Sequence, residues 1–356
     1  MNIKQMLTDV RGGRIEYIDC MRGFAMLLVV YCHVIYLGFG MDFTSVARII
    51  VRFHMPLFFF ISGFMSYTQN PNKQWLSIRL WNRLLSQYVP ALVVGWIYTM
   101  FRGQDFFVSM LLDTAKNGYW FTLALFEIFC LYAILVYLLN LGKVWISIAS
   151  VLIILSTHAI ETYLYSTDAS IINSDWYIIL CGRYILLYTK FFFIGVLAKM
   201  WLRQFMKIVE SKFIMAVSAI AFAVLHLGLE RHHSRLLLGI LGILIVWNFF
   251  HYYQNYFSSK TRVGRILSFV GKNTLQIYFL HYFFIVGMTN LQSTSFAQIL
   301  IDNWFVELLV VIAISIVIII CCLLVDKFVR SIPWIHVLMF GPKTKKNDKK
   351  TNIIYS

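Results

Sequence analysis

RIEYIDCMRGFAMLLVVYCH, residues 14–33, opens on Asp19 and Arg22, continues as an apolar run, and carries His33 towards its far end. From residue 23 onward the chain has the composition of a helix that crosses a membrane, because about 20 apolar residues span a hydrocarbon core of roughly 30 Å. Ionisable side chains at such depth are costly, rare and usually functional. This stretch therefore predicts a membrane-embedded fold with a polar site inside it.

The whole chain has the composition of an integral membrane protein. Of its 356 residues, 60% are apolar, 17% are aromatic and only 13% are charged. We expect one polytopic domain over residues 1–330, with no cleavable signal peptide ahead of it, and a basic cytoplasmic tail over residues 331–356. Apolar runs predict an all-α bundle of about ten transmembrane helices, the fifth the shortest, near residues 23–40, 49–68, 84–101, 119–140, 144–159, 176–198, 213–229, 236–253, 274–291 and 304–325.

The placement of lysine and arginine predicts that both termini face the cytoplasm. With that orientation 23 of the 31 basic residues lie in inner segments, six lie in outer segments, and Arg183 and Lys190 fall inside the sixth run. Such an excess on one side is the usual signature of cytoplasmic loops. The net charge of +15 is then explained by topology, which argues against a nucleic-acid partner.

The six cysteines predict neither disulfides nor a metal site. They lie in or at the ends of apolar runs and have no CxxC spacing, so we interpret them as small apolar packing residues. They are Cys20, Cys32, Cys130, Cys181, Cys321 and Cys322.

Three predicted spans place an ionisable side chain at a similar depth below the outer surface. At 1.5 Å per residue, His33 and Arg183 lie about 10 Å deep and Glu127 about 12 Å deep. His54 is expected slightly above this layer, and His281 roughly 13 Å up from the cytoplasmic side, near the midplane. Each charge costs on the order of 2.5–3.5 kcal/mol unless it faces a partner or water, so a shared polar cavity is the economical arrangement.

Simpler explanations of these residues stay open at this point. Glu127 and Arg183 could form a fixed ion pair that joins two helices, and His33 could be a histidine satisfied by packing. Asp19 and Arg22 are three residues apart, so they could form a local pair that holds the end of the first span.

From about residue 14 to residue 325 the chain resembles the acyltransferase 3 family, multi-span membrane enzymes that O-acylate cell-envelope glycans, and five of its segments resemble the signature segments of that family. One departure is RLWNRLLSQYVP at 79–90, in which Gln87 stands near the proline expected from the family. The matching segments are the opening RIEYIDCMRGFAMLLVVYCH at 14–33, FHMPLFFFISGF at 53–64, NGYWFTLALF at 117–126, FFFIGVLAK at 191–199 and GKNTLQIYFLHYFF at 271–284.

The resemblance implies a multi-pass O-acetyltransferase of a bacterial-type inner (plasma) membrane. It implies no tightly bound cofactor, acyl-CoA as the cytoplasmic co-substrate, with acetyl-CoA expected, and a cell-surface or lipid-linked glycan as the acceptor beside the lipid bilayer. Arg79 and Arg83 are four residues apart and share a helix face, so with Arg22, and with Arg14 nearby, their guanidinium groups could hold the phosphates of CoA. Routine positive-inside flanking is the alternative explanation of these arginines.

If the chain is an acyltransferase, we expect His33 to be its central catalytic residue. An imidazole titrates near neutrality, so His33 could take the proton from an acceptor hydroxyl or carry the acyl group itself. Glu127 could orient His33, and Arg183 or the Ser62 hydroxyl could stabilise an oxyanion. His54 and His281 are further candidates. The rival hypothesis is a transporter or lipid flippase, but the chain lacks a pair of matching halves with broken helices.

Overall fold

A computed structural model describes residues 16–342, with gaps at 42–43, 70, 72, 140–141, 168–169, 229–234 and 289–302. The described residues form helices and turns, and no β-strand occurs among them, in agreement with the predicted all-α class. Arg14 lies outside the described residues.

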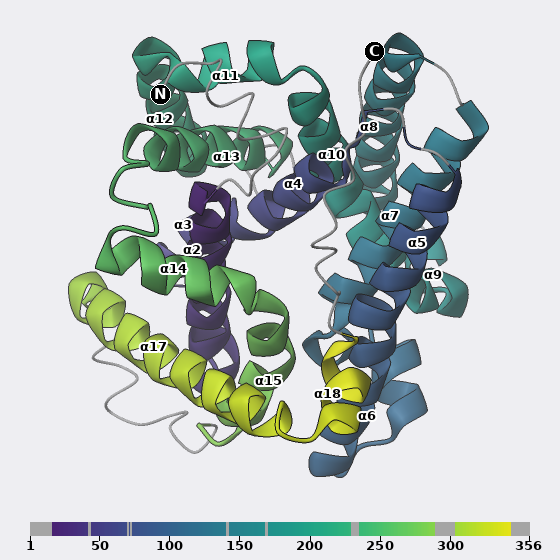
Figure 1. Ribbon diagram of the computed structural model, residues 1–356, viewed down its shortest axis with the longest axis vertical. Coiled ribbons are helices and arrows are strands. Elements are labelled where there is room, and N and C mark those ends of the chain that lie inside the picture. The colour runs from purple at the N-terminus through teal and green to yellow at the C-terminus, as the bar shows by residue number, and fades with distance from the viewer. Residues whose placement is uncertain are drawn as a thin grey trace, which may run out of the picture.

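The first half of the chain contributes helices α2 (Glu16–His33), η1 (Val34–Gly38), α3 (Ser45–Ile50), α4 (His54–Ser66), α5 (Lys73–Arg83), η2 (Leu84–Tyr88), α6 (Val89–Phe101), η3 (Val108–Leu112), η4 (Lys116–Gly118), α7 (Trp120–Leu139) and α8 (Lys143–Ser166). The second half contributes η5 (Ser170–Asn173), α9 (Asp175–Ile179), α10 (Gly182–Met200), α11 (Leu202–Glu210), α12 (Lys212–Gly228), α13 (Arg235–Tyr252), α14 (Arg262–Lys272), α15 (Thr274–Val286), α17 (Trp304–Val329) and α18 (Pro333–Phe340). In Figure 1, α2 and α4 lie between α11–α13 on one side and α14, α15 and α17 on the other.

Seven helical segments of the described chain are long and apolar enough to cross a membrane. Helix α10 continues into α11 after a bend of 100°, and this pair would make an eighth crossing. Helices α12 and α15 are apolar but shorter, and they coincide with the seventh and ninth predicted runs. Every predicted run therefore falls on an apolar helix, while the count of ten and the cytoplasmic location of the termini stay predictions. The seven segments are Tyr17–Gly38, Ser45–Ser66, Lys73–Phe101, Trp120–Leu138, Lys143–Ser166, Arg235–Tyr252 and Trp304–Val329.

The helices alternate in direction around the centre of the molecule. Helices α2 and α15 run parallel, since Arg22 contacts Thr274 near their starts and His33 contacts His281 further along. Helix α7 runs against α15, because Phe121 contacts Tyr278 one turn from the Gly118 contact with Tyr282. Successive contacts show that α10 runs in the same direction as α7, since Trp120 contacts Tyr184 and Tyr132 contacts Phe192. Helix α4 runs the same way, since Phe59 contacts Tyr188 and Phe64 contacts Lys199. So does α13, since Gly239 lies beside Pro56 and Trp247 beside Phe64. The bundle thus has two ends, which we name after Arg22 and His33.

Glycines allow α4 and α10 to pack closely at their crossing. A Cβ atom added at Gly63 would lie 1.9 Å from the Phe192 carbonyl oxygen, and one at Gly195 would lie 2.0 Å from the Phe60 carbonyl oxygen. Small residues at such a crossing let two backbones touch, which is the usual way that helices associate in lipid. Any larger side chain at Gly63 or Gly195 would push the two helices apart.

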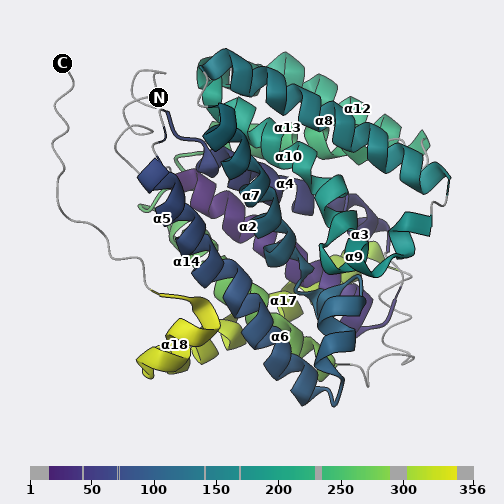
Figure 2. The same ribbon diagram turned by 90° about the vertical axis from the view of Figure 1, so that its right-hand side faces the viewer.

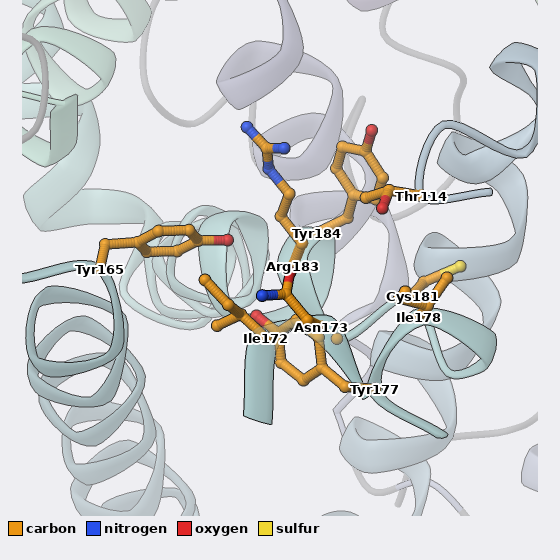
Figure 3. Close-up of a pocket in the computed structure, with 10 residues that line it drawn as sticks. Thr114, Tyr165, Ile172, Asn173, Tyr177, Ile178, Cys181, Arg183 and Tyr184 are labelled. Atoms are coloured by element: carbon orange, nitrogen blue, oxygen red, sulfur yellow. The ribbon is translucent and has the colours of Figure 1, made fainter. Parts of the chain in front are cut away.

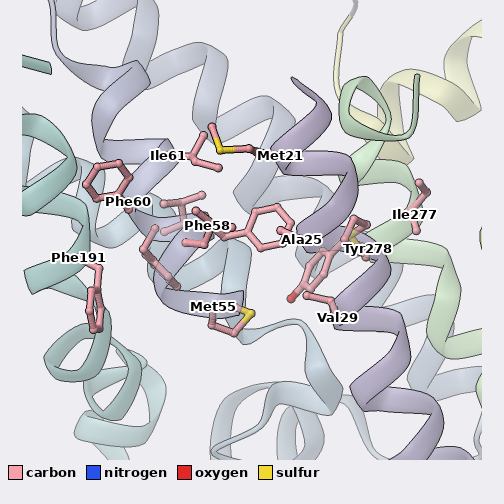
Figure 4. Packing of buried hydrophobic residues seen from close by; sticks show 14 of the residues in the cluster. Met21, Ala25, Val29, Met55, Phe58, Phe60, Ile61, Phe191, Ile277 and Tyr278 are labelled. Atoms are coloured by element: carbon pink, nitrogen blue, oxygen red, sulfur yellow. The ribbon is translucent and has the colours of Figure 1, made fainter. Parts of the chain in front are cut away.

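The central apolar core joins α4 to α2. Met55 and Phe58 of α4 point towards α2, as Figure 4 shows, where Ala25 and Val29 face them. The ring of Tyr278 approaches from α15 on the far side of α2. This packing holds the helices that carry the polar residues in a fixed relation.

The segment predicted as a cytoplasmic tail begins with a packed helix. Helix α18 occupies residues 333–340 and contacts α6. In Figure 2 it projects beside the lower part of the bundle. Residues 343–356 lie outside the described part of the chain, so the boundary at residue 330 stays a prediction.

Candidate active site

A cavity of about 1040 Å³ lies between the helices and reaches from the Arg22 end to the His33 end. Six of the candidates from the sequence line it, namely Arg22, His33, His54, Ser62, Arg83 and Arg183. Four other candidates are not among its lining residues, namely Asp19, Arg79, Glu127 and His281. Of these, His281 contacts the lining residue His33. The shared polar cavity expected from the sequence is therefore present, although not all of the predicted residues line it.

His33 and His281 form a hydrogen-bonded pair at the cavity wall. The Nδ1 atom of His33 lies 2.9 Å from the Nε2 atom of His281, and the two rings stack with centroids 5.1 Å apart. His281 is fully buried, and its Nδ1 atom lies 3.0 Å from the carbonyl oxygen of Ile277. A carbonyl oxygen can only accept, so Nδ1 of His281 donates, and Nε2 of a neutral His281 must accept from His33.

This chain of hydrogen bonds selects one tautomer of His33. Its Nδ1 atom carries the hydrogen, so its Nε2 atom has the free lone pair of a base or a nucleophile. His33 ends α2 and the π-helical turn η1 follows it directly, an irregularity that is frequent at functional sites. The sequence predicted His281 as a separate candidate, and the tertiary structure brings it against His33.

Two tyrosines connect His33 to the loop before α7. The hydroxyl of Tyr282 lies 3.4 Å from Nε2 of His33 and donates to the carbonyl oxygen of Gly118 at 3.1 Å. Tyr278 donates to the same carbonyl at 2.7 Å. Because its hydrogen is directed to Gly118, the Tyr282 oxygen can accept from Nε2 of His33 once that nitrogen has been protonated.

The loop that supplies this carbonyl has an unusual backbone. Three consecutive residues, Lys116, Asn117 and Gly118, have φ angles of 52°, 50° and 93°. The Lys116 ammonium is buried and donates to the carbonyl oxygen of Leu111 at 2.6 Å, and its burial lowers its pKa. Left-handed backbone at non-glycine residues costs free energy and is concentrated at functional sites.

Arg83 and Gln87 lie towards the Arg22 end of the cavity. Nη2 of Arg83 donates to the Ser66 hydroxyl at 2.8 Å, and its guanidinium lies 4.0 Å from the ring centre of Phe129. Nη1 of Arg83 and Oε1 of Gln87 are buried and have no hydrogen-bond partner in the described chain. Both residues line the cavity, so these two atoms are positioned to bind a ligand.

Arg22 and Asp19 form the local pair that their spacing allowed. Nη1 of Arg22 lies 3.7 Å from the Asp19 carboxylate, and Nη2 donates to the Thr274 hydroxyl at 2.9 Å. Arg22 lines the cavity, whereas Asp19 is buried beside it. Arg79 does not line the cavity; it donates to the carbonyl oxygen of the lining residue Met65 and stacks on Trp75.

Glu127 and Arg183 do not form an ion pair with each other. Arg183 lines the cavity at the His33 end, while Glu127 is half-buried and its Oε2 atom has no hydrogen-bond partner in the described chain. His33 is oriented by its hydrogen bond to His281, with Tyr282 beside its Nε2 atom, so Glu127 is not the residue that orients it.

His54 and Ser62 complete the set of sequence candidates in the cavity. Nδ1 of His54 lies 2.9 Å from the carbonyl oxygen of Ile50 and donates to it, which leaves Nε2 as an acceptor. Ser62 lies two turns further along α4 and lines the cavity.

Comparison with known protein families identifies the family of this chain. A family model described as an acyltransferase domain, that of the acyltransferase 3 family, matches residues 15–327. This chain belongs to the acyltransferase 3 family. Neither a search of curated proteins nor a search of solved structures found a match. The matched region of this acyltransferase thus covers the described bundle up to α17.

Sequence reasoning missed a buried ion triad in this acyltransferase. The Glu161 carboxylate binds the Lys190 ammonium with one oxygen and the Arg235 guanidinium with the other, the latter at 3.3 Å. Lys190 is fully buried, and Arg235 lines the cavity. The lysine in the sixth run was visible in the sequence, but its partners on α8 and α13 are far away in the chain.

The candidate site residues from the sequence also did not include Tyr278 and Tyr282, although both lie in the family-like segment at 271–284. Tyr278 precedes His281 by three residues and Tyr282 follows it by one, so all three lie close together on α15. That spacing was a usable signal.

A smaller pocket of about 100 Å³ adjoins the acyltransferase cavity. It shares Thr114, Arg183 and Tyr184 with the large cavity, and its other lining residues come from the end of α8, from η5, from α9 and from the turn into α10. Figure 3 shows the Arg183 side chain extending away from Tyr177.

Proposed function

We propose that this acyltransferase moves an acetyl group from acetyl-CoA to a hydroxyl of a cell-surface or lipid-linked glycan in a bacterial-type inner membrane. His33 is the catalytic residue of this proposal. The observation that carries it is the His281 to His33 hydrogen bond, which leaves a basic nitrogen at the wall of a cavity that also contains Arg22 and Arg83. In this proposal the donor binds at one end of that cavity and the acceptor at the other.

The donor is assigned to the Arg22 end, which faces the cytoplasm in the proposed orientation. Arg22 and Arg83 line the cavity there, and the unpartnered Nη1 of Arg83 and Oε1 of Gln87 are available to a ligand. Guanidinium groups bind phosphate oxygens through paired hydrogen bonds, which suits the phosphates of CoA. The thioester would then extend along the cavity towards His33.

The transfer step is assigned to Nε2 of His33. This atom takes the proton of the acceptor hydroxyl while the hydroxyl oxygen attacks the thioester carbonyl carbon. The new C–O bond forms, the C–S bond breaks, and the thiolate of CoA receives the proton from the His33 imidazolium. The Tyr282 oxygen, 3.4 Å away, accepts a hydrogen bond from the protonated ring in the interval.

The same nitrogen would serve a two-step route, in which His33 carries the acyl group as an acyl-imidazole. Rapid quenching of enzyme with radiolabelled acetyl-CoA and no acceptor distinguishes the routes. Label bound to protein through a hydroxylamine-sensitive bond supports the acyl carrier, and its absence together with transfer to acceptor supports the base.

The function itself is tested with purified protein in liposomes. Wild type should transfer label from acetyl-CoA to envelope glycan, whereas H33A should lose transfer at an unchanged melting temperature. His226 on α12 is a matched control, since it lies outside the cavity lining, and H226Q should retain transfer. Wild-type transfer by H33A would remove His33 from the reaction, and glycan flux across the liposome without acylation would favour a flippase.

A further inference from the structure

Arginine is concentrated at the His33 end of the cavity. Five arginines line the cavity there, and we call them the arginine cluster: Arg48, Arg52, Arg102, Arg183 and Arg235. Helices α4, α10 and α13 begin at this end and α6 ends there, which brings together residues that are far apart in the chain. No lysine lines the described cavity, so its cationic lining consists of guanidinium groups alone.

Membrane topology does not account for the cluster. In the predicted orientation this end faces outward, where basic residues are scarce. Four of the six basic residues assigned to outer segments nevertheless line this one cavity, and Arg183 makes the fifth member. Basic residues that served only to flank spans would be spread around the bundle rather than gathered around one cavity.

The carboxylates near the cluster do not neutralise it. Asp113 is the one carboxylate among the described lining residues, and its oxygens accept from the backbone N–H groups of Ala115 and Asn117, both at 3.2 Å. Glu161 pairs with Arg235 but also with Lys190, so that triad keeps a net positive charge. Among the described residues, this end of the cavity therefore carries an excess of positive charge.

We propose that the acceptor is an anionic glycan, whose carboxylate or phosphate groups bind the arginine cluster while a hydroxyl reaches Nε2 of His33. This inference rests on the proposed function and specifies its acceptor. Guanidinium is the group that matches carboxylate and phosphate geometry with two parallel hydrogen bonds, which lysine cannot do. A neutral sugar could not form these paired, charge-assisted hydrogen bonds with the cluster.

The experiment compares anionic and neutral probes in the same assay. The probes are a glucuronic-acid-containing tetrasaccharide, its carboxyl-reduced neutral form, and a neutral saccharide on polyprenyl diphosphate, which separates sugar carboxylates from lipid phosphates as the anion. The cluster variant is R48Q/R102Q, because both side chains are exposed and their loss should not unfold the protein. The control is R203Q/R262Q, which removes the same charge from exposed positions outside the cavity lining.

We expect the cluster variant to raise KM for at least one anionic probe tenfold or more, with little change for the neutral tetrasaccharide. The control should keep the wild-type KM values. Binding of the same probes to purified protein, followed by thermophoresis, separates this inference from the proposed function, because binding needs no turnover. Tighter binding of an anionic probe that weakens in R48Q/R102Q supports the inference even if no acyl group is transferred.

Equal binding of the anionic and carboxyl-reduced tetrasaccharides and of the polyprenyl diphosphate saccharide would overturn the inference. So would a cluster variant indistinguishable from R203Q/R262Q with every anionic probe.

Discussion

Nδ1 of His33 on α2 lies 2.9 Å from Nε2 of His281 on α15, although 248 residues separate them in the chain. The Ile277 carbonyl oxygen fixes the far side of His281 at 3.0 Å. In this arrangement the base, His33, is oriented by a second side chain, which is a histidine here and a carboxylate in many hydrolases. Unlike a carboxylate, His281 holds the ring of His33 without adding a negative charge inside the bundle.

Replacing His281 should therefore weaken catalysis without removing the catalytic nitrogen. We expect H281L to lower kcat on the order of 10²-fold, because His33 can then adopt the other tautomer or turn away. H281Q retains an acceptor for Nδ1–H of His33 and should recover part of the loss. The pH profile of kcat is the diagnostic measurement: its acid limb should move in H281L, whereas a purely structural role would lower Tm and leave that limb in place.

Gly118 should tolerate no side chain. Its φ of 93° is left-handed, and a Cβ there would lie 2.2 Å from Cζ of Tyr282. The backbone cost alone is about 1–2 kcal/mol, and the clash displaces Tyr282 from His33. We expect G118A to lower Tm and acyl transfer together. G142A is the matched control, since nothing lies within 4 Å of a Cβ at Gly142; equal effects of the two changes would contradict this prediction.

Replacing Arg83 should weaken donor binding more than replacing Arg79. R83K keeps the charge but loses the forked guanidinium whose Nη1 has no partner in the described chain, so KM for acetyl-CoA should rise about tenfold. R79K should have the smaller effect, because Arg79 does not line the cavity and its guanidinium is already engaged by the Met65 carbonyl oxygen and the Trp75 ring. Isothermal titration with CoA checks the ranking, and a larger loss in R79K would reverse the assignment.

The buried triad should govern stability. E161Q leaves the fully buried Lys190 ammonium without its carboxylate partner, and breaking a buried pair in this way costs about 3–5 kcal/mol. Adding K190M should recover much of that loss, since no uncompensated buried ammonium then remains. Thermal unfolding in one detergent measures all three proteins. A double variant less stable than E161Q would mean that Lys190 has another role.

Salt should weaken acceptor binding if the arginine cluster acts through charge. Raising ionic strength from 0.1 M to 1 M shortens the Debye length from about 10 Å to about 3 Å. We expect KM for the anionic tetrasaccharide to increase over this range and KM for its carboxyl-reduced form to stay nearly constant. Parallel increases for both probes would point to a general effect of salt on the protein.

The sequence by itself determined the membrane setting, the helical class and the positions of the apolar helices. These follow from local composition, because a run of apolar residues must be helical to satisfy its backbone in lipid. It also predicted His33, Arg22 and Arg83, whose charge or polarity in an apolar run is visible without any neighbour.

Only the tertiary structure decided how those side chains meet. Glu127 and Arg183 share a predicted depth, yet depth does not specify the direction in which a side chain leaves its helix, and they do not pair. His281 was placed near the midplane and turned out to contact His33. The ion triad of Glu161, Lys190 and Arg235 depends on the rotation and packing of three helices. Helix rotation is set by contacts between residues far apart in the chain, so no single stretch of sequence contains it.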